Sequence, residues 1–540
     1  MSSVSPNAPE SPSDRPNFLI VITDQFHPRC LGYAGHPVVR TPNIDRLAAS
    51  GMNFTRMYSN QPLCMPARAT MFTGLTPRGH RVRMNGIPLD PCFPTFTEAL
   101  RLAGYHTHSC GKIHLSCSLP PTGSQEEIAL PGGYPRLKAL WEEGRLDEMP
   151  LPYYGLESVD ICGGHGTSSW GHYVDWLKAE HPGEAHLFLD AVPLEPPTPA
   201  FDLFNRKSFK WALPAALHPM TWIADRTIDF LDDAGRQRKA NPHTARPFCL
   251  FCSIQEPHSP FAPPREYAYR FDPADVPPAV GREGELDDLP PHFRAMVETD
   301  ITTSGNKAQA MNKTAPYRAE CAAHYYALIE MVDDQVGRVM DSLKANGLEE
   351  DTIVLFVADH GEALGDHGLW SKGPYHIDGV IRVPFLVRWP GRIPPEQVFD
   401  GPVSLIDFAP TLLDMADVPI PEGAVPVQTE APDAPPAWPG RSLFPVLEGA
   451  DRNTDTNALV EMDEDYLGFK MRTLVTRRYR LTCYSGHDYG ELFDLHEDPD
   501  ELYNLWNDPD SRTIRDELRI RLLDKIVQTD ISVPRQLSRS

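Results

Sequence analysis

Three short apolar runs, each followed at once by polar residues, limit the folds open to this chain more than any other feature. They are residues 17–22 (NFLIVI), 248–254 (FCLFCSI) and 352–357 (TIVLFV). Runs of this length are typical of strands buried on both faces, as in a parallel sheet covered by helices. A fourth stretch, 105–109 (YHTHS), is more polar, but it precedes a similar polar motif, and we expect a strand there as well.

Helical patterns separate these strands. Residues 43–50, 96–103 and 223–231 have the composition of helices, and apolar residues recur at steps of three and four between 328 and 343. The alternation predicts an α/β fold with a large mixed, mostly parallel sheet flanked by helices. In such sheets ligands bind beyond the carboxyl ends of the strands. We therefore expect one sheet edge to gather the residues that follow the predicted strands: Asp24, Lys112, His258, Asp359 and His360.

Other stretches mark the predicted domain organisation. Residues 118–215 and 270–315 carry few regular signals, which favours insertions that shape a pocket. The Pro-rich stretch 418–440 indicates a linker, and strand-like runs and a last helix at about 511–528 follow it. The predicted organisation is a disordered leader at 1–16, a main domain at 17–417, the linker, and a smaller C-terminal α+β subdomain with a tail at 441–540.

Composition narrows the function. The 540 residues include 50 Lys and Arg against 74 Asp and Glu, a formal charge of -24 that disfavours nucleic acid and anionic membranes as partners. The sequence has no apolar run long enough to span a membrane, and its first residues do not have the pattern of a secretory signal. Its ten scattered cysteines are typical of a reducing compartment. A cytoplasmic location is therefore expected. Cys249 and Cys252 form a CxxC on a predicted strand, where they face opposite sides, so a shared metal is not expected.

Cys64 lies in the segment CMPAR (64–68), where a loop is predicted to lead into a helix. The residues alone leave four readings open. Cys64 is a thiolate nucleophile, a zinc ligand, a buried structural thiol or a cysteine that becomes chemically modified.

The residues predicted to meet at the sheet edge suit one divalent cation and one oxyanion. Two carboxylates, an imidazole and a cysteine predict a metal site. Positive or proton-donating groups around it suit a tetrahedral oxyanion, namely Arg68, Lys112, His114, His258 and Lys372. This set predicts metal-assisted transfer of a sulfuryl or phosphoryl group.

At this point the sequence resembles a known family. CMPAR, flanked by NIDRLAASGMNFTRMYSN and ATMFTGLTPRGHRVRMNG, is similar to the C-x-P-x-R signature of the sulfatases, which belong to the alkaline phosphatase superfamily. The resemblance continues in order through NFLIVITDQ, GYHTHSCGKIHL, EPHSPF, DDQVGRVMDSL, IVLFVADHGEALGDHGLWSKGPYHIDGVIRVPFLVRWPG, VSLIDFAPTLLDMA and ELFDLHEDPDELYNL. It covers the chain from Asn17 to about residue 508.

The resemblance implies that Cys64 is oxidised by a separate formylglycine-generating enzyme. The aldehyde of formylglycine takes up water to form a geminal diol, whose one hydroxyl attacks sulfur while the second helps to expel sulfate. Pro66 and Arg68 then belong to the modification signature. The implied roles are sulfate binding for Lys112 and Lys372, proton transfer from the diol for His114, and a place beside the leaving group for His258.

The resemblance also implies the metal ligands, which are Asp24, Gln25, Cys64 after modification, Asp359 and His360. Gln25 stands where many sulfatases have a second aspartate, a pattern similar to choline sulfatases and phosphonate monoester hydrolases. With one carboxylate fewer and one imidazole, Mn²⁺ is an alternative to Ca²⁺. Thr107 and either Asp366 or His367 are further candidates near the site.

The sequence is compatible with three functions. The first is hydrolysis of a small anionic aryl or alkyl sulfate ester, and the second is hydrolysis of a phosphonate monoester or phosphodiester at the same formylglycine site. The third is a noncatalytic sulfate-binding protein in which Cys64 remains a thiol. A homo-oligomer is also considered, with the C-terminal tail as a subunit contact.

Overall fold

The computed structural model describes residues 15–117, 136–196, 208–299, 315–421, 438–450, 456–465 and 467–530. The predicted leader, apart from its last two residues, most of the predicted linker and the C-terminal tail lie outside the described residues. Parts of the two predicted insertions lie outside them as well.

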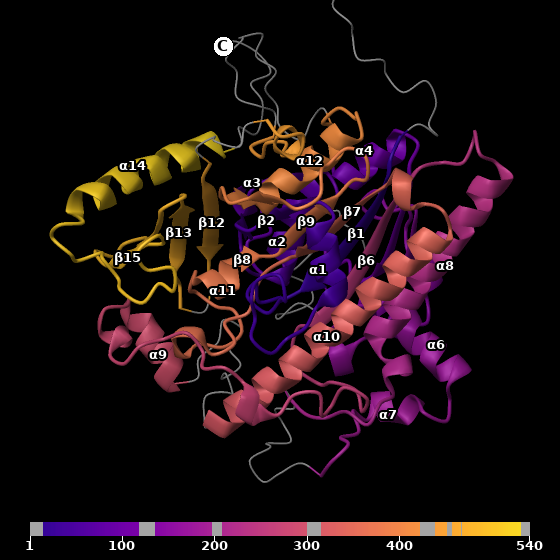
Figure 1. Cartoon of the computed structure of the whole chain (residues 1–540), viewed down its shortest axis with the longest axis horizontal. Helices are drawn as coiled ribbons and strands as arrows, with labels where there is room; N and C mark the ends of the chain where they lie inside the picture. Colours follow the sequence, from indigo (N-terminus) through magenta and orange to yellow (C-terminus); the bar gives the residue numbers. More distant parts are fainter. Residues whose placement is uncertain are drawn as a thin grey trace, which may run out of the picture.

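A mixed eight-stranded sheet forms the centre of the large domain (Figure 1). Its strand order is β10-β2-β9-β7-β1-β6-β4-β5, and β7, β1, β6, β4 and β5 run parallel. The strands in order along the chain are β1 (Asn17–Asp24), β2 (Met52–Phe54), β4 (His106–Gly111), β5 (Ser158–Ile161), β6 (Phe248–Pro257), β7 (Thr352–Ala358), β9 (Phe385–Arg388) and β10 (Gln397–Phe399).

The centre of this sheet is buried on both faces. β1 lies between β6 and β7, so that Ile20 is paired with Phe251 on one side and Leu355 on the other. Every residue of β1, β6 and β7 is buried, as the apolar runs in the sequence predict. The predicted α/β class, with a mostly parallel sheet, is therefore confirmed.

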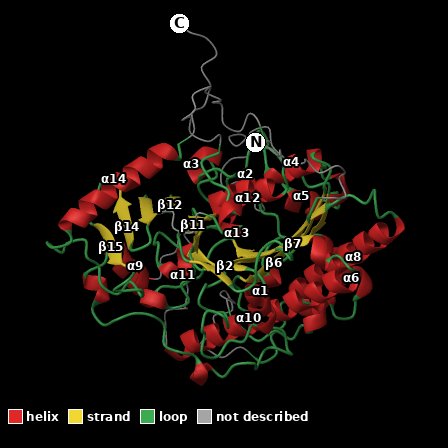
Figure 2. Cartoon of the chain, turned by 45° about the horizontal axis from the view of Figure 1, so that its top comes forward, coloured by secondary structure: helices red, strands yellow, loops and turns green. Residues whose placement is uncertain are grey.

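Helices cover the sheet on both faces (Figure 2). On one face lie α1 (Pro42–Ala49), α6 (His172–Glu180), α8 (Pro219–Ala240) and α10 (Ala315–Ala345). On the other lie α2 (Cys64–Thr73), α4 (Phe96–Leu102), α5 (Leu137–Glu142) and α12 (Phe408–Met415). The remaining helices are α3 (Pro77–His80), α7 (Ala185–Leu189), α9 (Pro291–Thr299), α11 (Asp378–Ile381) and α13 (Phe444–Leu447).

The C-terminal part forms a second sheet. It is antiparallel, with the order β12 (Ala458–Asp463), β13 (Lys470–Val475), β14 (Tyr479–Tyr484) and β15 (Gly490–Asp494), and α14 (Arg512–Gln528) packs against it. A small third sheet consists of β11 (Val403–Ser404), β3 (Met57–Tyr58) and β8 (Arg382–Val383), in that order. Its strand β11 contacts β12. The smaller C-terminal α+β subdomain is thus confirmed as an element of the fold.

The region 118–215 is more regular than its sequence predicts. Its described residues contain α5, α6, α7 and β5, and β5 is the last strand of the main sheet. The sequence did not predict these elements, because it carries few regular signals there. A four-residue edge strand with three half-buried residues leaves no clear apolar pattern in the sequence.

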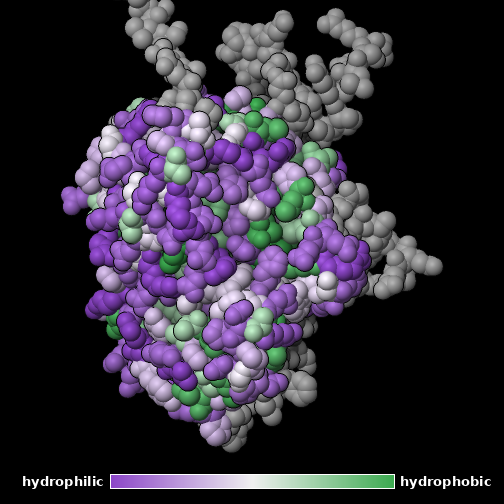
Figure 3. Space-filling model, turned by 90° about the vertical axis from the view of Figure 1, so that its right-hand side faces the viewer, coloured by the Kyte–Doolittle hydropathy of each residue, from purple (hydrophilic) through white to green (hydrophobic). Residues whose placement is uncertain are grey.

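The side of the molecule that carries α6 and α8 is mostly hydrophilic, with small separate hydrophobic groups (Figure 3). None of the helices in the described ranges has both the length and the apolar composition that crossing a membrane requires.

Candidate active site

Cys64 is the first residue of α2, at the point where an extended loop enters the helix. Leu63 before it is extended, and Ala67 N–H donates to Leu63 O at 2.9 Å, which closes the first helical turn. The cysteine is only 1% exposed. Because the N-terminus of a helix carries a partial positive charge, this position favours an anionic sulfur or oxygen.

The loop before Cys64 is held by the C-terminal sheet. Asn60 Nδ2 donates to Leu459 O at 2.8 Å, and Glu461 N–H donates to Asn60 O at 2.8 Å. Both partners belong to β12. The second sheet therefore fixes the approach to Cys64, although more than 390 residues separate the two segments.

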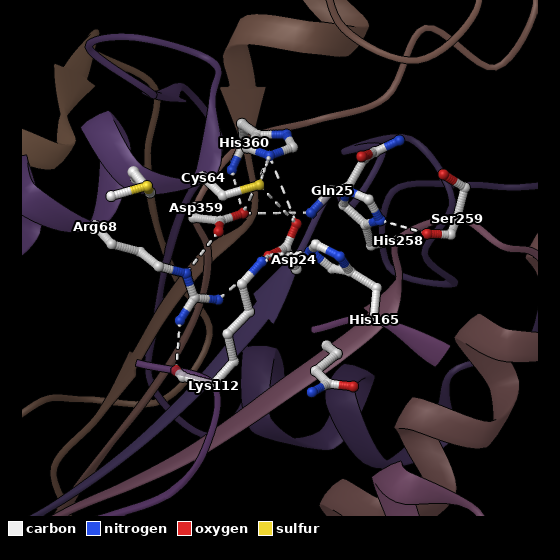
Figure 4. A network of polar contacts seen from close by, with 12 residues as sticks. Asp24, Gln25, Cys64, Arg68, Lys112, His165, His258, Ser259, Asp359 and His360 are labelled. Atoms are coloured by element: carbon white, nitrogen blue, oxygen red, sulfur yellow. Dashed lines mark hydrogen bonds and ion pairs between the residues drawn. The ribbon is translucent and has the colours of Figure 1, made fainter. Parts of the chain in front are cut away.

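Two carboxylates and one imidazole surround the cysteine sulfur (Figure 4). Asp24 ends β1, and Asp359 and His360 directly follow the neighbouring β7, so the parallel register brings them to one edge. Cys64 Sγ lies 3.6 Å from Asp24 Oδ1 and 3.3 Å from His360 Nε2. Ligand atoms of all four residues lie within 4.8 Å of one another.

Arg68 joins these groups from the second turn of α2. Its Nε donates to Asp359 Oδ2 at 2.8 Å, and its Nη2 lies 3.5 Å from Asp24 Oδ2. Its Nη1 donates to Lys112 O at 2.8 Å and to Ser253 Oγ at 3.0 Å. One guanidinium thus contacts residues in or directly after four adjacent strands, β7, β1, β6 and β4.

Two lysines contact different members of this group. Lys112 follows β4 and contacts Asp24, while its Nζ lies 2.6 Å from His165 Nε2. Lys372 Nζ lies 3.3 Å from Cys64 Sγ, 3.0 Å from His360 Nε2 and 2.7 Å from Gln25 Oε1. Both ammonium groups can bind oxygens of an anion placed above the cysteine.

Three more imidazoles complete the surroundings, and one of them was not predicted. His258 follows β6 and stacks on His165 with ring centroids 3.6 Å apart (Figure 4). His165 meets His114 edge to face at 6.3 Å. Sequence reasoning missed His165 because its loop belongs to the region judged irregular. The glycine-rich setting GGHG (163–166) is the signal that could have drawn attention to it.

The charges shift the pKa values of these groups in a consistent way. Burial raises the pKa of the Cys64 thiol, but Lys112, Lys372 and His360 outweigh it and bring that pKa well below its ordinary value. Burial and Cys64 raise the pKa of Asp24, yet Lys112, His258 and Lys372 hold it well below the usual range. Burial and the charge of Asp24 raise the pKa of Asp359 to about 6. The site therefore favours a concentrated negative charge at Asp24 and Cys64.

The environment of all three surrounding imidazoles favours their neutral form, because it lowers their pKa values. Burial, followed by the charge of Lys112, lowers the pKa of both His114 and His165 to about 4. Burial and His165 likewise bring the pKa of His258 well below its usual value. Neutral imidazoles can accept protons, which suits a site that must move them.

The donor set fits a divalent cation. Asp24, Asp359 and His360 are all fully buried, and their carboxylate oxygens and imidazole nitrogen are the donor types that a divalent cation such as Ca²⁺ or Mn²⁺ takes. Gln25 has a positive φ of 62° that turns its side chain to the same edge. Its Oε1 accepts from Lys372, while its amide Nε2 contacts Glu362, so the oxygen is the atom that faces the cysteine side.

The structure thus brings together every residue of the main predicted set. Thr107 lies apart from them, since it precedes Lys112 by five residues along β4, which is about 16 Å of strand, and its hydroxyl donates to Gly155 O. Asp366 contacts His27 Nε2 and Val280 N–H, and His367 contacts Glu285. These two line the region beside the cluster and have no hydrogen bond to it among the described contacts.

Comparison with known proteins agrees with this geometry. The profile of the family described as Sulfatase matches residues 16–125 and 201–418, and that described as N-sulphoglucosamine sulphohydrolase, C-terminal, matches 365–528. An arylsulfatase of Clostridium perfringens is 30% identical over 95% of this chain and 94% of its own. A choline-sulfatase of Rhizobium meliloti is 27% identical over 92% of this chain and 83% of its own.

A solved structure with a similar fold supports this comparison. The phosphonate monoester hydrolase of Agrobacterium radiobacter superposes with a TM-score of 0.74 at 27% identity, over 96% of each chain. The family profile covers most of the chain. The site agrees with it, since a buried cysteine at a helix N-terminus lies among two carboxylates and two lysines. The chain belongs to the sulfatase family and is a sulfuric ester hydrolase.

Proposed function

We propose that the chain hydrolyses a small aryl or alkyl sulfate ester, with Cys64 acting after conversion to formylglycine. The observation that carries this proposal is the position of Cys64 Sγ, which lies within 3.6 Å of Asp24, His360 and Lys372. A thiolate at Cys64 offers one nucleophilic atom and no second hydroxyl, whereas the hydrate of an aldehyde at the same Cβ supplies two hydroxyl groups. One hydroxyl attacks sulfur and the other can later release the sulfate.

Asp24, Asp359 and His360 would hold one divalent cation, Ca²⁺ or Mn²⁺, with Gln25 Oε1 as a further ligand. Bound there, the cation would lower the pKa of the attacking hydroxyl and offset the charge of the ester. Arg68 holds the two carboxylates in place, with a hydrogen bond to Asp359 and an ion pair with Asp24. It thereby fixes the positions that the cation needs before the substrate binds.

Lys112, which contacts Asp24, and Lys372, which contacts Cys64 and His360, would bind nonbridging sulfate oxygens. As negative charge moves toward the leaving-group oxygen, these fixed charges stabilise the transition state without any rearrangement. His258 lies on the side of Lys112 and His165, and we assign it to the leaving group. Its Nδ1 lies 2.6 Å from Ser259 O and donates to it, which leaves Nε2 to face the reacting atoms.

His114 is assigned to the second half of the reaction. Its Nδ1 is buried and has no hydrogen-bond partner in the described part of the chain. A neutral imidazole in this position can take the proton of the second hydroxyl when sulfate leaves, which restores the aldehyde. We further propose that a separate formylglycine-generating enzyme makes this aldehyde from Cys64.

Mass spectrometry of the peptide that contains Cys64 tests the proposal directly. In active protein we expect CH₂SH to be replaced by CHO, and Cys64→Ala should lose nearly all turnover of 4-nitrophenyl sulfate. Cys252→Ala is the matched control, because Cys252 is equally buried but lies within β6, and it should retain turnover. Fully active protein with an unmodified Cys64 thiol would overturn the mechanism.

Phosphonate monoester or phosphodiester hydrolysis is the second candidate. The observation in its favour is the structural match to a phosphonate monoester hydrolase at 27% identity. The charged groups around Cys64 would serve phosphoryl transfer equally well. Comparing kcat/KM for 4-nitrophenyl sulfate and a phenyl phosphonate ester separates the two candidates, and a much larger value for the phosphonate would favour the second.

A further inference from the structure

A second cluster of metal-binding side chains lies on β4 and β5, away from Cys64. His108 and Cys110 are two residues apart on β4, so they face the same side of the sheet. Asp160 of β5 is the register partner of Cys110. Ligand atoms of these three side chains lie within 4.8 Å of one another, and the cluster shares none of them with the active site.

The hydrogen bonds orient the imidazole toward the carboxylate. His108 Nδ1 lies 2.7 Å from Ser158 Oγ, and the same hydroxyl lies 3.2 Å from His106 Nε2. A serine hydroxyl has one hydrogen; when it is donated to His106, the oxygen accepts from His108 Nδ1–H. The lone pair on His108 Nε2 then faces Asp160 Oδ2 at 3.2 Å, and a cation between these two acceptors satisfies both.

This arrangement matches what metal-ligating histidines require. A histidine ligand ordinarily donates its other ring nitrogen to an oxygen, which fixes the tautomer and the ring plane. Phe230 of α8 also stacks on the His108 ring, with centroids 4.9 Å apart and an interplanar angle of 18°. The imidazole is therefore held in one orientation before any ion arrives.

The site is buried yet reachable. Cys110 is fully buried, the His108 side chain is 8% exposed, and the Asp160 side chain is 35% exposed, which gives an ion a path from solvent. The guanidinium of Arg226, whose charge helps to lower the pKa of Asp160, is paired with Asp229 at 2.6 Å. Burial and then the charge of Asp160 raise the pKa of the Cys110 thiol, and a cation bound beside it would stabilise the thiolate.

We propose that His108, Cys110 and Asp160 bind a zinc ion, with water in the fourth position. A thiolate, an imidazole and a carboxylate form a tetrahedral donor set that selects Zn²⁺ over the hard cations Ca²⁺ and Mn²⁺. On binding, the thiol proton passes to water and a Zn–S bond forms. The ion would tie the edge strand β5 to β4, four residues before His165 enters the active site.

Cobalt titration of the full-length Cys64→Ala variant tests this site, because that background removes the active-site sulfur. After chelation and dialysis, we expect Co²⁺ to produce a thiolate-to-cobalt charge-transfer absorption, and one equivalent of Zn²⁺ to abolish it. Zn²⁺ should also raise the melting temperature. Adding Cys110→Ser should remove the absorption, and adding Asp160→Asn should weaken Zn²⁺ binding about tenfold or more.

The matched control is Cys252→Ser in the same background. Cys252 is the register partner of Cys110 on β6 and is equally buried, but it does not belong to the cluster, so the absorption should remain. If Cys110→Ser does not fold, Asp160→Asn decides the question alone, since this partly exposed residue changes little in shape. The proposal is overturned if no thiolate absorption forms, or if Asp160→Asn binds Zn²⁺ as tightly as its parent. Neither outcome depends on sulfate turnover, so the proposed function is tested separately.

Discussion

Arg68 contacts several groups at the buried active site, and we expect it to contribute strongly to stability. It is 2% exposed, and its guanidinium contacts Asp24, Asp359, Lys112 O and Ser253 Oγ. Removing one partner of a buried ion pair leaves uncompensated charge, whose cost exceeds the usual worth of the pair. In chelator-treated protein, we expect Arg68→Ala to lower the free energy of unfolding by about 3–5 kcal/mol, measured by urea denaturation.

The matched control for this prediction is Arg145→Ala. Arg145 also pairs with two carboxylates, Glu143 and Glu148, but on the surface. It should leave the unfolding midpoint unchanged, because exposed pairs are screened by water. Equal effects of the two substitutions would contradict the bridging role of Arg68.

Glu256 predicts a pH dependence of stability. Its two carboxylate oxygens are buried and have no hydrogen-bond partner in the described part of the chain, and burial raises its pKa from 4.5 to about 8. Between these values the folded state keeps a proton that the unfolded state has lost, so stability falls as pH rises through this window and is constant above it. The slope is about 1.4 kcal/mol per pH unit.

Glu256→Gln should remove this contribution, since the amide has no proton to lose. We expect the variant to gain stability relative to the parent between pH 5 and pH 8, measured by urea unfolding at several pH values. Glu283→Gln, at an exposed position, should show no such gain. A constant difference between Glu256→Gln and the parent at all pH values would show that Glu256 titrates normally.

At the scale of elements, one helix holds the start of another. Asp333 of α10 accepts hydrogen bonds from Asn43 N–H at 3.0 Å and Ile44 N–H at 2.8 Å, both in the first turn of α1. The first N–H groups of a helix lack acceptors within the helix. The carboxylate of Asp333 provides these acceptors from the neighbouring helix. Asp333→Ala should lower the free energy of unfolding by about 1–3 kcal/mol.

Thermal or urea unfolding checks this value against Asp341→Ala, an exposed residue of the same helix that should change little. A loss as small as that of Asp341→Ala would mean that water replaces the carboxylate at the start of α1.

The same scale shows what the sequence can predict and what it cannot. β1, β6 and β7 follow from their apolar runs because strands buried on both faces leave a continuous signal, and the site residues follow from their place after these strands. β2 and β3 have three and two residues, too few for any periodicity. His165 was missed because its position depends on β5, whose pairing with β4 is a long-range contact that no local pattern reveals.

At the scale of the whole molecule, a cation at Cys64 should stabilise the fold. Asp24 and Asp359 are fully buried side by side, and a ligand that binds only the folded state stabilises it by mass action. After chelation, adding Ca²⁺ or Mn²⁺ at about 100 times its dissociation constant should raise the free energy of unfolding by about 2.7 kcal/mol.

Differential scanning calorimetry measures this response as a rise in melting temperature. Asp359→Asn should weaken it, whereas Asp160→Asn should retain it, because Asp160 belongs to the separate cluster on β5. An unchanged response in Asp359→Asn would place the bound cation elsewhere.

The hydrogen bonds between the Cys64 loop and β12 can form only after β12 has been synthesised. The folded molecule encloses Cys64, so the oxidising enzyme that we propose would have to reach it earlier, while Asn60 still lacks its partners Leu459 and Glu461. Those partners are synthesised almost 400 residues later, which at ribosomal speed is roughly 20–80 s. Under the proposed function, this order of synthesis would leave Cys64 accessible to that enzyme until Leu459 and Glu461 have been made.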